Sequence, residues 1–401
     1  MNLTPDSLRN YIFIALVIIT IIFIARPPSS SEVVSLNGAG SSFIYPLMST
    51  WIPNFQNVYR NISVNYQSIG SGGGIRAIID GTVDFAASDA PLNSEEYTNA
   101  RDKGTIMHLP ITIGAAVIAY NIPKLDGRLI LSGEVVAKIY LGEISRWNDP
   151  AIRKLNPKIS LPDKEIIVVK RSDGSGTTYM FTDYLSHVSD IWAKTIGKTK
   201  IFDFPTKIGD RGIAAKGNEG VTGAILQNPY SIGYIELTYA LQNNIPYASL
   251  KNKAGNVVEA NSTTISAAAR SAYNSLPDST SSWENVSIVN QDDPLAYPLS
   301  SFVYILVYLN QPSVNKANAL KRWLSWITTN GQLFSESLHY APLPESIINK
   351  NLEALKRISA SKSLAPMVCC SPYSENIFHS IEQGISVFFI EIGRLNYDYP
   401  I

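Results

Sequence analysis

The hydrophobic positions of this chain fall into short runs whose spacing alternates between the strand period and the helix period. From Val33 onward, the runs VVSLNG, SVNYQSIG and EIIVVKRS are typical of β-strands. Each continues through glycine and hydroxyl residues into a stretch with helical spacing, namely FIYPLMSTWIPNF, IRAIIDGT and TTYMFTDYLSHV. These strand–loop–helix units, all before residue 190, predict an α/β fold with mainly parallel sheets.

Two further apolar runs are long and continuous: IGAAVIAYN at residues 113–121 and SSFVYILVYLN at 300–310. The chain has 401 residues, which is enough for two domains of ordinary size. In a protein whose two lobes share the chain, such strands are natural points for crossing between them. We therefore predict one lobe formed by residues 33–114 and 298–358, and a second lobe formed by residues 115–297.

Residues 1–32 are predicted to be an N-terminal anchor or signal segment with its linker. Tyr11–Ala25 is an uninterrupted apolar run that ends at Arg26, within the length of a signal-peptide core and slightly short for a straight membrane helix. Cleavage after Ala25 would place Phe23 where a small residue is required, which favours an uncleaved anchor. The protein is then expected outside the cytoplasm, tethered by residues 11–25. Three glycosylation triplets, at Asn61, Asn261 and Asn285, agree with that location.

The C-terminal segment, residues 359–401, differs from the rest of the chain. It follows an amphipathic helical pattern that ends near residue 358, and it contains Cys369 and Cys370, the two cysteines of the protein. The sequence does not explain the role of this tail or of its cysteines.

The charge balance excludes some classes of partner. Lysine plus arginine and aspartate plus glutamate both number 33, so the formal net charge is zero and no general field attracts nucleic acid. An anion must therefore be bound by local groups. The four histidines are scattered without metal-ligand spacing, so we predict no metal site and no cofactor.

Three glycine-rich loops are candidates for such local anion binding: GAGSSF at 38–43, GSGGG at 70–74 and RSDGSGT at 171–177. A helix N-terminus offers unpaired backbone N–H groups and a partial positive charge, and glycine lets the backbone approach closely. Serine and threonine add neutral donors. The nucleotide-binding patterns GxxxxGK[ST] and GxGxxG are absent, which predicts a small anion.

At these loops the chain resembles the high-affinity phosphate-binding proteins of bacterial and archaeal phosphate ABC transporters. The similar segments include GAGSSFIYP, IGSGGG, SDAPL, RSDGSGT, GNEGV, SIGYIE and YAPLP, in the order found in that family, from about residue 35 to 358. The resemblance implies a two-lobed periplasmic-binding-protein-like fold of type II. It also implies a monomeric, non-enzymatic subunit that captures inorganic phosphate and delivers it to ABC permease subunits.

The resemblance further implies a set of phosphate ligands. Carried over position by position, they are Ser42, Phe43, Ser71, Asp89, Arg171, Ser175, Gly176 and Thr177, with Asp173 expected to hold Arg171 in place. Three departures stand out. Ser42 replaces a common threonine, Gly72 replaces a common second serine, and the family's lipid-anchoring cysteine is missing, so the apolar segment would have to serve as the anchor.

A carboxylate in an anion site has a chemical use. Phosphate at neutral pH keeps a proton that it can donate to Asp89, whereas sulfate has none and would face the carboxylate with lone pairs only. Because an unpaired buried charge costs several kcal/mol, such a site can reject the analogue that lacks the hydrogen bond by about 10⁴ or more. Asp89 is thus expected to provide the selectivity for phosphate.

Other functions and simpler roles stay open at this level. Ser175 could be the nucleophile of a phosphoester hydrolase, although the sequence offers no evident base or metal beside it. The chain could instead be a stand-alone oxyanion binder or a receptor component. Asp89 could simply cap a helix, and Arg171 with Asp173 could be a surface ion pair.

Overall fold

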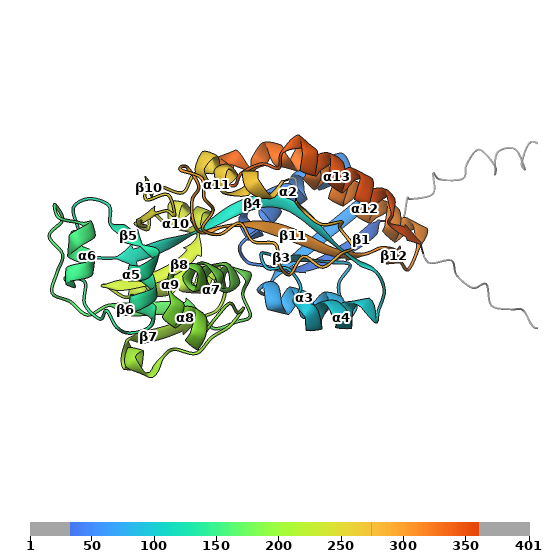
Figure 1. Ribbon diagram of the computed structural model, residues 1–401. Helices are drawn as coiled ribbons and strands as arrows, with labels where there is room; N and C mark the ends of the chain where they lie inside the picture. Colours follow the sequence, from blue (N-terminus) through green and yellow to red (C-terminus); the bar gives the residue numbers. More distant parts are fainter. Residues whose placement is uncertain (1–32, 274, 361–401) are drawn as a thin grey trace, which may run out of the picture. The chain divides into compact units, whose positions relative to one another are not determined.

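The computed structural model describes residues 33–273 and 275–360 (Figure 1). The predicted anchor, residues 11–25, and nearly all of the C-terminal tail, with Cys369 and Cys370, lie outside this part of the chain. Within it, no helix is both long and apolar enough to cross a membrane.

The principal element is a mixed sheet of eight strands in the order β2-β1-β3-β11-β4-β8-β6-β7. In sequence order these strands are β1 (Val34–Gly40), β2 (Ile62–Ser68), β3 (Phe85–Ser88), β4 (Ile106–Asn121), β6 (Ile167–Arg171), β7 (Gly212–Ala215), β8 (Ser231–Glu236) and β11 (Ser300–Tyr308). β2, β1 and β3 run parallel, as do β8, β6 and β7, while β11 and β4 run antiparallel to their neighbours. The predicted mainly parallel α/β architecture is confirmed.

β4 joins two halves of this sheet. Its residues 106–115 pair with β11, and its residues 116–121 pair with β8. We call β2, β1, β3, β11 and the first part of β4, with the loops and helices that adjoin these strands, the first half. The second part of β4 with β8, β6 and β7, and the loops and helices that adjoin them, form the second half. The mostly apolar sequence of β4 fits this position, because fifteen of its sixteen residues are buried. β11 pairs only with β3 and β4, so it stays in the first half.

Two small sheets contain the remaining strands of the described residues. One has three strands in the order β10-β9-β5, formed by Val257–Val258, Ser249–Lys251 and Ile130–Ser132. The other pairs β12 (Asn310–Gln311) in parallel with β13 (Ser359–Ala360). Regular structure therefore continues two residues past the expected end at residue 358.

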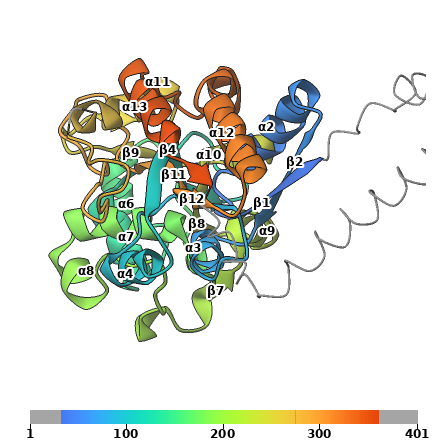
Figure 2. The same ribbon diagram turned by 90° about the vertical axis from the view of Figure 1, so that its right-hand side faces the viewer.

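Helices cover both faces of the large sheet. They are α2 (Tyr45–Val58), α3 (Ser71–Ile79), α4 (Ser94–Arg101), α5 (Gly133–Tyr140), α6 (Pro150–Leu155), α7 (Gly176–Val188), α8 (Asp190–Thr195), α9 (Gly217–Gln227), α10 (Leu237–Gln242), α11 (Ser262–Ala269), α12 (Val314–Thr328) and α13 (Glu345–Lys356). Both views show α2, α12 and α13 on one face and α3 and α4 on the other (Figures 1 and 2). On the first of these faces, Phe55 of α2 packs edge-on against Trp323 of α12, with ring centroids 5.0 Å apart.

One boundary differs from the sequence pattern in an informative way. The helical spacing predicts a start near Ile75, but α3 begins at Ser71 and takes Gly72, Gly73 and Gly74 into its first turns. Glycine is a poor helix former, so its presence needs another reason. A side chain at Gly74 would place its Cβ 2.4 Å from the Cα of Gly40. The glycines therefore allow the start of α3 to lie directly against the end of β1.

Candidate anion-binding site

The three glycine-rich loops come together at the ends of their strands. GAGSSF includes the last three residues of β1, GSGGG follows β2, and RSDGSGT starts at the last residue of β6. The backbone N–H of Gly72 donates to the carbonyl of Gly174 at 2.9 Å, which joins a loop of the first half to a loop of the second. Gly70 has φ +82°, and a Cβ there would lie 2.2 Å from Oδ2 of Asp173. The close approach of these loops therefore requires glycine.

Asp89 lies at the centre of the loops. It follows β3 and is 1% exposed. Its Oδ1 accepts hydrogen bonds from the hydroxyls of Ser41 and Ser71, the latter at 2.6 Å, and its Oδ2 accepts one from Thr177 at 3.1 Å. The proposed helix-capping role does not apply, because α4 is capped by Asn93. Hydroxyls from three separate loops thus converge on one buried carboxylate.

Arg171 brings a buried positive charge to the same place. Its Nε and Nη2 donate to the two carboxylate oxygens of Asp173 at 2.8 and 2.5 Å, and its Nη1 lies 3.4 Å from the hydroxyl of Thr177. The side chains of Arg171 and Asp173 are only 1% and 13% exposed, so this is not a surface ion pair. The backbone N–H of Gly217 also donates to Oδ1 of Asp173 at 3.1 Å. Asp173 is thereby held in place, and its two hydrogen bonds fix the position of the Arg171 guanidinium.

The two charges stabilise each other against burial. Burial alone lowers the pKa of Arg171, but the hydrogen bond and negative charge of Asp173 outweigh it, so the pKa is raised. Burial likewise raises the pKa of Asp173, but the hydrogen bond and charge of Arg171 outweigh it and the pKa is lowered. Arg171 therefore stays positive and Asp173 negative over the whole physiological range.

The remaining predicted residues lie in the same loops with local partners. The N–H of Phe43 donates to the hydroxyl of Ser41 at 3.0 Å. The hydroxyl of Ser175 accepts the N–H of Thr178 at 3.0 Å and caps α7. Gly176 begins α7, and a Cβ there would lie 2.4 Å from Cγ of Asp89. Ser42 is buried and its hydroxyl contacts Asn218 rather than Asp89.

Two polar residues of this cluster were missed by the sequence reasoning. Ser41, not Ser42, is the serine of its loop that bonds to Asp89. Asn218 is fully buried and contacts both Ser42 and Thr177. A signal for Asn218 exists, since the segment KGNEG follows β7 and leads into α9 in the same way as the three recognised loops.

Three tyrosines, also missed, bind the backbone of the first loop. The hydroxyls of Tyr66, Tyr239 and Tyr340 donate to the consecutive carbonyls of residues 41, 42 and 43, at 2.8, 2.8 and 2.5 Å. Burial raises the pKa of all three phenols, so they remain donors. Because each carbonyl already has a donor, the loop can direct N–H and hydroxyl groups rather than carbonyls toward an anion.

Comparison with known proteins identifies the family. Residues 25–330 match the model of the PBP superfamily domain. The phosphate-binding protein PstS of Pasteurella multocida is 40% identical over 327 residues, covering 80% of this chain and 90% of that protein. The phosphate-binding protein PstS of Methanocaldococcus jannaschii is 36% identical over 348 residues, covering 82% and 89%.

The chain belongs to the PstS family of phosphate-binding proteins. Solved structures agree on the fold. The structure of a high-affinity periplasmic phosphate-binding protein bound with phosphate aligns with a TM-score of 0.63 at 20% identity, covering 79% of this chain and 92% of that one. A phosphate-binding protein from Stenotrophomonas maltophilia aligns with a TM-score of 0.62 at 16% identity, covering 80% and 93%. The expected α/β, two-lobed periplasmic-binding-protein-like fold of type II is confirmed.

A second buried carboxyl lies behind the cluster in this PstS-family chain. Glu236 ends β8 and is fully buried, and its carboxylate accepts the N–H and the hydroxyl of Thr238 at 2.9 and 3.1 Å. Burial raises the pKa of Glu236 to about 8, although the bonds from Thr238 oppose the shift. Glu236 is therefore mostly protonated at neutral pH.

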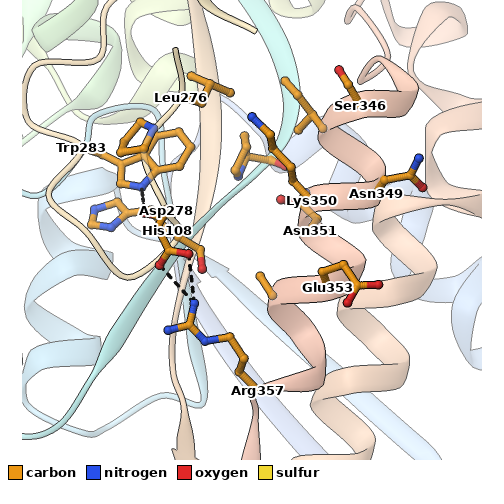
Figure 3. Close-up of a pocket in the computed structure, with 15 residues that line it drawn as sticks. His108, Leu276, Asp278, Trp283, Ser346, Asn349, Lys350, Asn351, Glu353 and Arg357 are labelled. Carbon is orange, nitrogen blue, oxygen red and sulfur yellow. Dashed lines mark hydrogen bonds and ion pairs between the residues drawn. The ribbon is translucent and has the colours of Figure 1, made fainter. Parts of the chain in front are cut away.

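The structure also has a separate cavity of about 560 Å³ beside α13 (Figure 3). It contains no predicted anion ligand. Asp278 and Arg357 form an ion pair at its edge, 3.0 Å apart, and their side chains are 58% and 42% exposed. The lining combines polar and charged side chains with apolar ones, which include Leu276, Pro277, Trp283, Ile347 and Ala354. Cavity size alone therefore does not mark the anion site.

Among residues 33–273 and 275–360, no group of three or more histidine, cysteine, aspartate or glutamate side chains could hold a metal ion. The expectation that the protein uses no metal or cofactor stays a prediction.

Proposed function

We propose that this protein is the extracytoplasmic substrate-binding subunit of a phosphate ABC importer and that it captures inorganic phosphate between its two lobes. The observation that carries the proposal is the convergence of the Ser71 and Thr177 hydroxyls on the buried carboxylate of Asp89, with the Arg171 guanidinium in contact with Thr177. Membership of the PstS family supports the same assignment. The matched relatives carry the names of phosphate-binding proteins and not of enzymes.

Asp89 would select phosphate by accepting a hydrogen bond from the O–H group that phosphate keeps at neutral pH. Its two oxygens already accept hydrogen bonds from three hydroxyls, so the surroundings of Asp89 favour the carboxylate as an acceptor. A phosphate that keeps one O–H can take the place of one such donor, whereas sulfate cannot. The unpaired negative charges would then oppose each other in a site closed to water.

The donors of the site can offset the dehydration of phosphate. A charge-assisted hydrogen bond contributes about 1.5–3 kcal/mol, and submicromolar binding needs more than about 8 kcal/mol in total. The Arg171 guanidinium, the hydroxyls of Ser42, Ser71, Ser175 and Thr177, and the N–H groups at Phe43 and Gly176 form the proposed ligand set. The N-termini of α3 and α7 add their partial positive charge.

The boundaries and surroundings of the protein are part of the proposal. We place the lobes at residues 33–114 with 298–358 and at residues 115–297, which agrees with the change of partner along β4 after residue 115. We expect a monomer, tethered to the cytoplasmic membrane by residues 11–25, that presents its closed form to ABC permease subunits. Closure of two lobes is a common way to exclude water from a bound ion.

The alternatives have less support. Hydrolysis would need a base beside Ser175, but in the described part of the chain its hydroxyl contacts only the N–H of Thr178. A stand-alone oxyanion binder or receptor would use the same site, and the presence of a neighbouring permease and ATPase in the genome would distinguish it.

The test is calorimetry on the full-length protein after unfolding and refolding to remove residual phosphate. We expect tight binding of phosphate and exclusion of sulfate and molybdate, with sulfate at least about 10⁴-fold weaker. The variant Asp89→Asn should lose most of this discrimination, because an amide can donate to sulfate. The control Asp278→Asn changes an exposed carboxylate in the cavity beside α13 and should keep it. If phosphate gave no binding heat, or if sulfate bound as tightly as phosphate, the proposal would be contradicted.

A further inference from the structure

Asn218 connects the two halves of the site. It is fully buried in the first turn of α9, in the second half of the fold. Its backbone N–H and its side-chain Nδ2 both donate to the hydroxyl of Ser42 at 3.0 Å, and Nδ2 also lies 3.3 Å from the hydroxyl of Thr177. Ser42 belongs to the first half and Thr177 to the second, so one amide contacts a proposed ligand from each.

The orientation of the Asn218 amide follows from its other partner. The backbone N–H of Glu236 approaches Oδ1 of Asn218 at 2.9 Å. A backbone N–H can only donate, so the atom facing it must be the amide oxygen. The NH₂ group must then face Ser42 and Thr177. The amide cannot be flipped without placing two donors against each other.

This orientation of the Asn218 amide determines whether the hydroxyl of Ser42 can donate or accept a further hydrogen bond. A serine hydroxyl has two lone pairs and one proton. Both lone pairs of Ser42 are engaged, one by the N–H and one by the NH₂ group of Asn218. Only its proton remains to be shared, and no residue in the described part of the chain accepts it. Ser42 is therefore held as a donor.

The hydroxyl protons of Thr177 and Ser71, unlike that of Ser42, are donated to a group of the protein. The hydroxyl of Thr177 accepts from Asn218 and Arg171 and donates its proton to Asp89. The hydroxyl of Ser71 also donates to Asp89. Their protons have an acceptor within the protein, whereas that of Ser42 does not. The loop cannot easily turn to release Ser42, because Tyr239 and Tyr340 hold its carbonyls.

We propose that Asn218 is a specificity-positioning residue, which fixes Ser42 as a donor to an unprotonated oxygen of the anion while Asp89 accepts the proton of another oxygen. The inference rests on the proposed function and extends it. The site would then distinguish the oxygens of a partly protonated tetrahedral oxyanion and orient it. Asn218 does this without being assigned a direct contact to the ion.

The test is a double-mutant cycle on the full-length protein with phosphate as the probe. Asn218→Ala and Ser42→Ala should each weaken phosphate binding by about 10- to 100-fold, the range expected for one charge-assisted hydrogen bond. If Asn218 acts through Ser42, the double variant should bind no more than about threefold more weakly than the weaker single variant. A purely structural asparagine would instead give losses that multiply.

A matched control lies at the C-terminal end of the same helix. Asn228 follows the C-terminal end of α9, and its Nδ2 donates to the carbonyl of Ala224 at 2.7 Å. Asn228→Ala should change the melting temperature but leave phosphate affinity within about twofold of the unaltered chain. A similar loss of affinity in Asn228→Ala and Asn218→Ala would show that weakening α9 is sufficient, and would overturn the inference.

A second variant guards against misfolding of Asn218→Ala. Asn218→Asp has the same shape and can still accept the N–H of Glu236, but its other oxygen would accept the proton of Ser42 and turn it from the anion. We expect a larger loss than for Asn218→Ala, and a smaller loss when Ser42 is already alanine. An equal loss in both backgrounds would point to charge repulsion alone and overturn the inference.

The result for the unaltered chain separates the two proposals. If it binds no phosphate, the proposed function fails and this inference fails with it. If it binds phosphate but the losses in the cycle multiply, only the role of Asn218 is overturned.

Discussion

Two arginine–aspartate pairs in this protein have the same chemistry but different surroundings. Arg171 and Asp173 are almost completely buried between the glycine-rich loops, and both also contact other polar groups of the site. Arg357 and Asp278 form their pair at the edge of the cavity beside α13, where both side chains are about half exposed. An exposed pair contributes at most about 1 kcal/mol, whereas breaking a buried one costs about 3–5 kcal/mol. Burial and the surrounding hydrogen bonds, not the pair itself, distinguish the site.

The polar groups of the anion site and of the cavity beside α13 also differ in whether they have hydrogen-bond partners. In the anion site, the hydroxyls that bond to Asp89 come from three loops and leave it with partners on both oxygens. Beside the cavity, His108 Nδ1 and Ser279 Oγ are buried and have no hydrogen-bond partner among the described residues. A region of converging, satisfied groups is prearranged for binding, whereas the cavity beside α13 is not.

The largest expected effect comes from removing the arginine of the buried ion pair. Arg171→Met removes the guanidinium and leaves the buried Asp173 without its partner, so phosphate affinity should fall about 10³-fold or more. Arg357→Met makes the same change in the exposed pair and should leave affinity within about twofold. Calorimetry on both variants tests this. Similar losses in the two would mean that burial does not separate the pairs.

A pH experiment compares one buried group from each region. Glu236 has a pKa raised to about 8 from 4.5, so in the pH range between them the folded state holds a proton that the unfolded state has lost. The free energy of unfolding should therefore fall as pH rises through this range. Each pKa unit corresponds to about 1.4 kcal/mol, so the fall is at most about 5 kcal/mol. Glu236→Gln should abolish it in urea unfolding at pH 5 and pH 8.

His108, beside the cavity, should behave in the opposite way. Burial lowers its pKa from 6.5 to about 3, so between these values the unfolded state binds the extra proton. Stability should fall as pH drops through this range, and His108→Gln should remove that part of the acid sensitivity. Phosphate affinity should be unaffected by this substitution. If both variants showed the same pH trend, the assigned protonation of one group would be wrong.

A glycine substitution gives a smaller effect. Gly176→Ala would place a methyl group against the carboxylate of Asp89, and crowding of this kind costs about 1–3 kcal/mol, so affinity should fall about 5- to 100-fold. Gly223→Ala is the matched change within α9, where a Cβ meets nothing within 4 Å. It should preserve affinity and raise stability by up to about 1 kcal/mol. Unchanged affinity in Gly176→Ala would argue against close packing at Asp89.

The smallest expected effect concerns an ion pair between the proposed lobes. Lys200 and Glu96 are paired and mostly buried, and the carbonyl of Lys200 also accepts the N–H of Ser175. Lys200→Met should weaken phosphate binding about two- to fivefold, through faster release. The control Lys316→Met removes a comparable pair with Asp84 within the first half and should leave the release rate unchanged. Stopped-flow release measurements distinguish them.

Much of the fold could be predicted from local patterns. The strands β1, β2 and β6 and the helices α2 and α7 begin and end within a few residues of the expected positions, because alternating apolar positions and glycine-rich boundaries are local signals. The start of α3 was placed too late, because its glycines are unfavourable in an isolated helix. Only the nearby end of β1 makes them necessary.

For the candidate site, too, local features could be predicted from the sequence and long-range contacts could not. The sequence by itself determined the glycine-rich loops, their position between strand and helix, and the presence of Arg171 in one of them, while Asp89 in SDAPL was implied by the resemblance to the family. Only the tertiary structure decided which hydroxyl meets which partner: that Ser41 rather than Ser42 bonds to Asp89, that Asn218 meets Ser42 from 176 positions away, and that three tyrosines bind one loop. The physical reason is range. Turn and helix preferences act between neighbours in the chain, whereas these hydrogen bonds form only after distant segments have packed together.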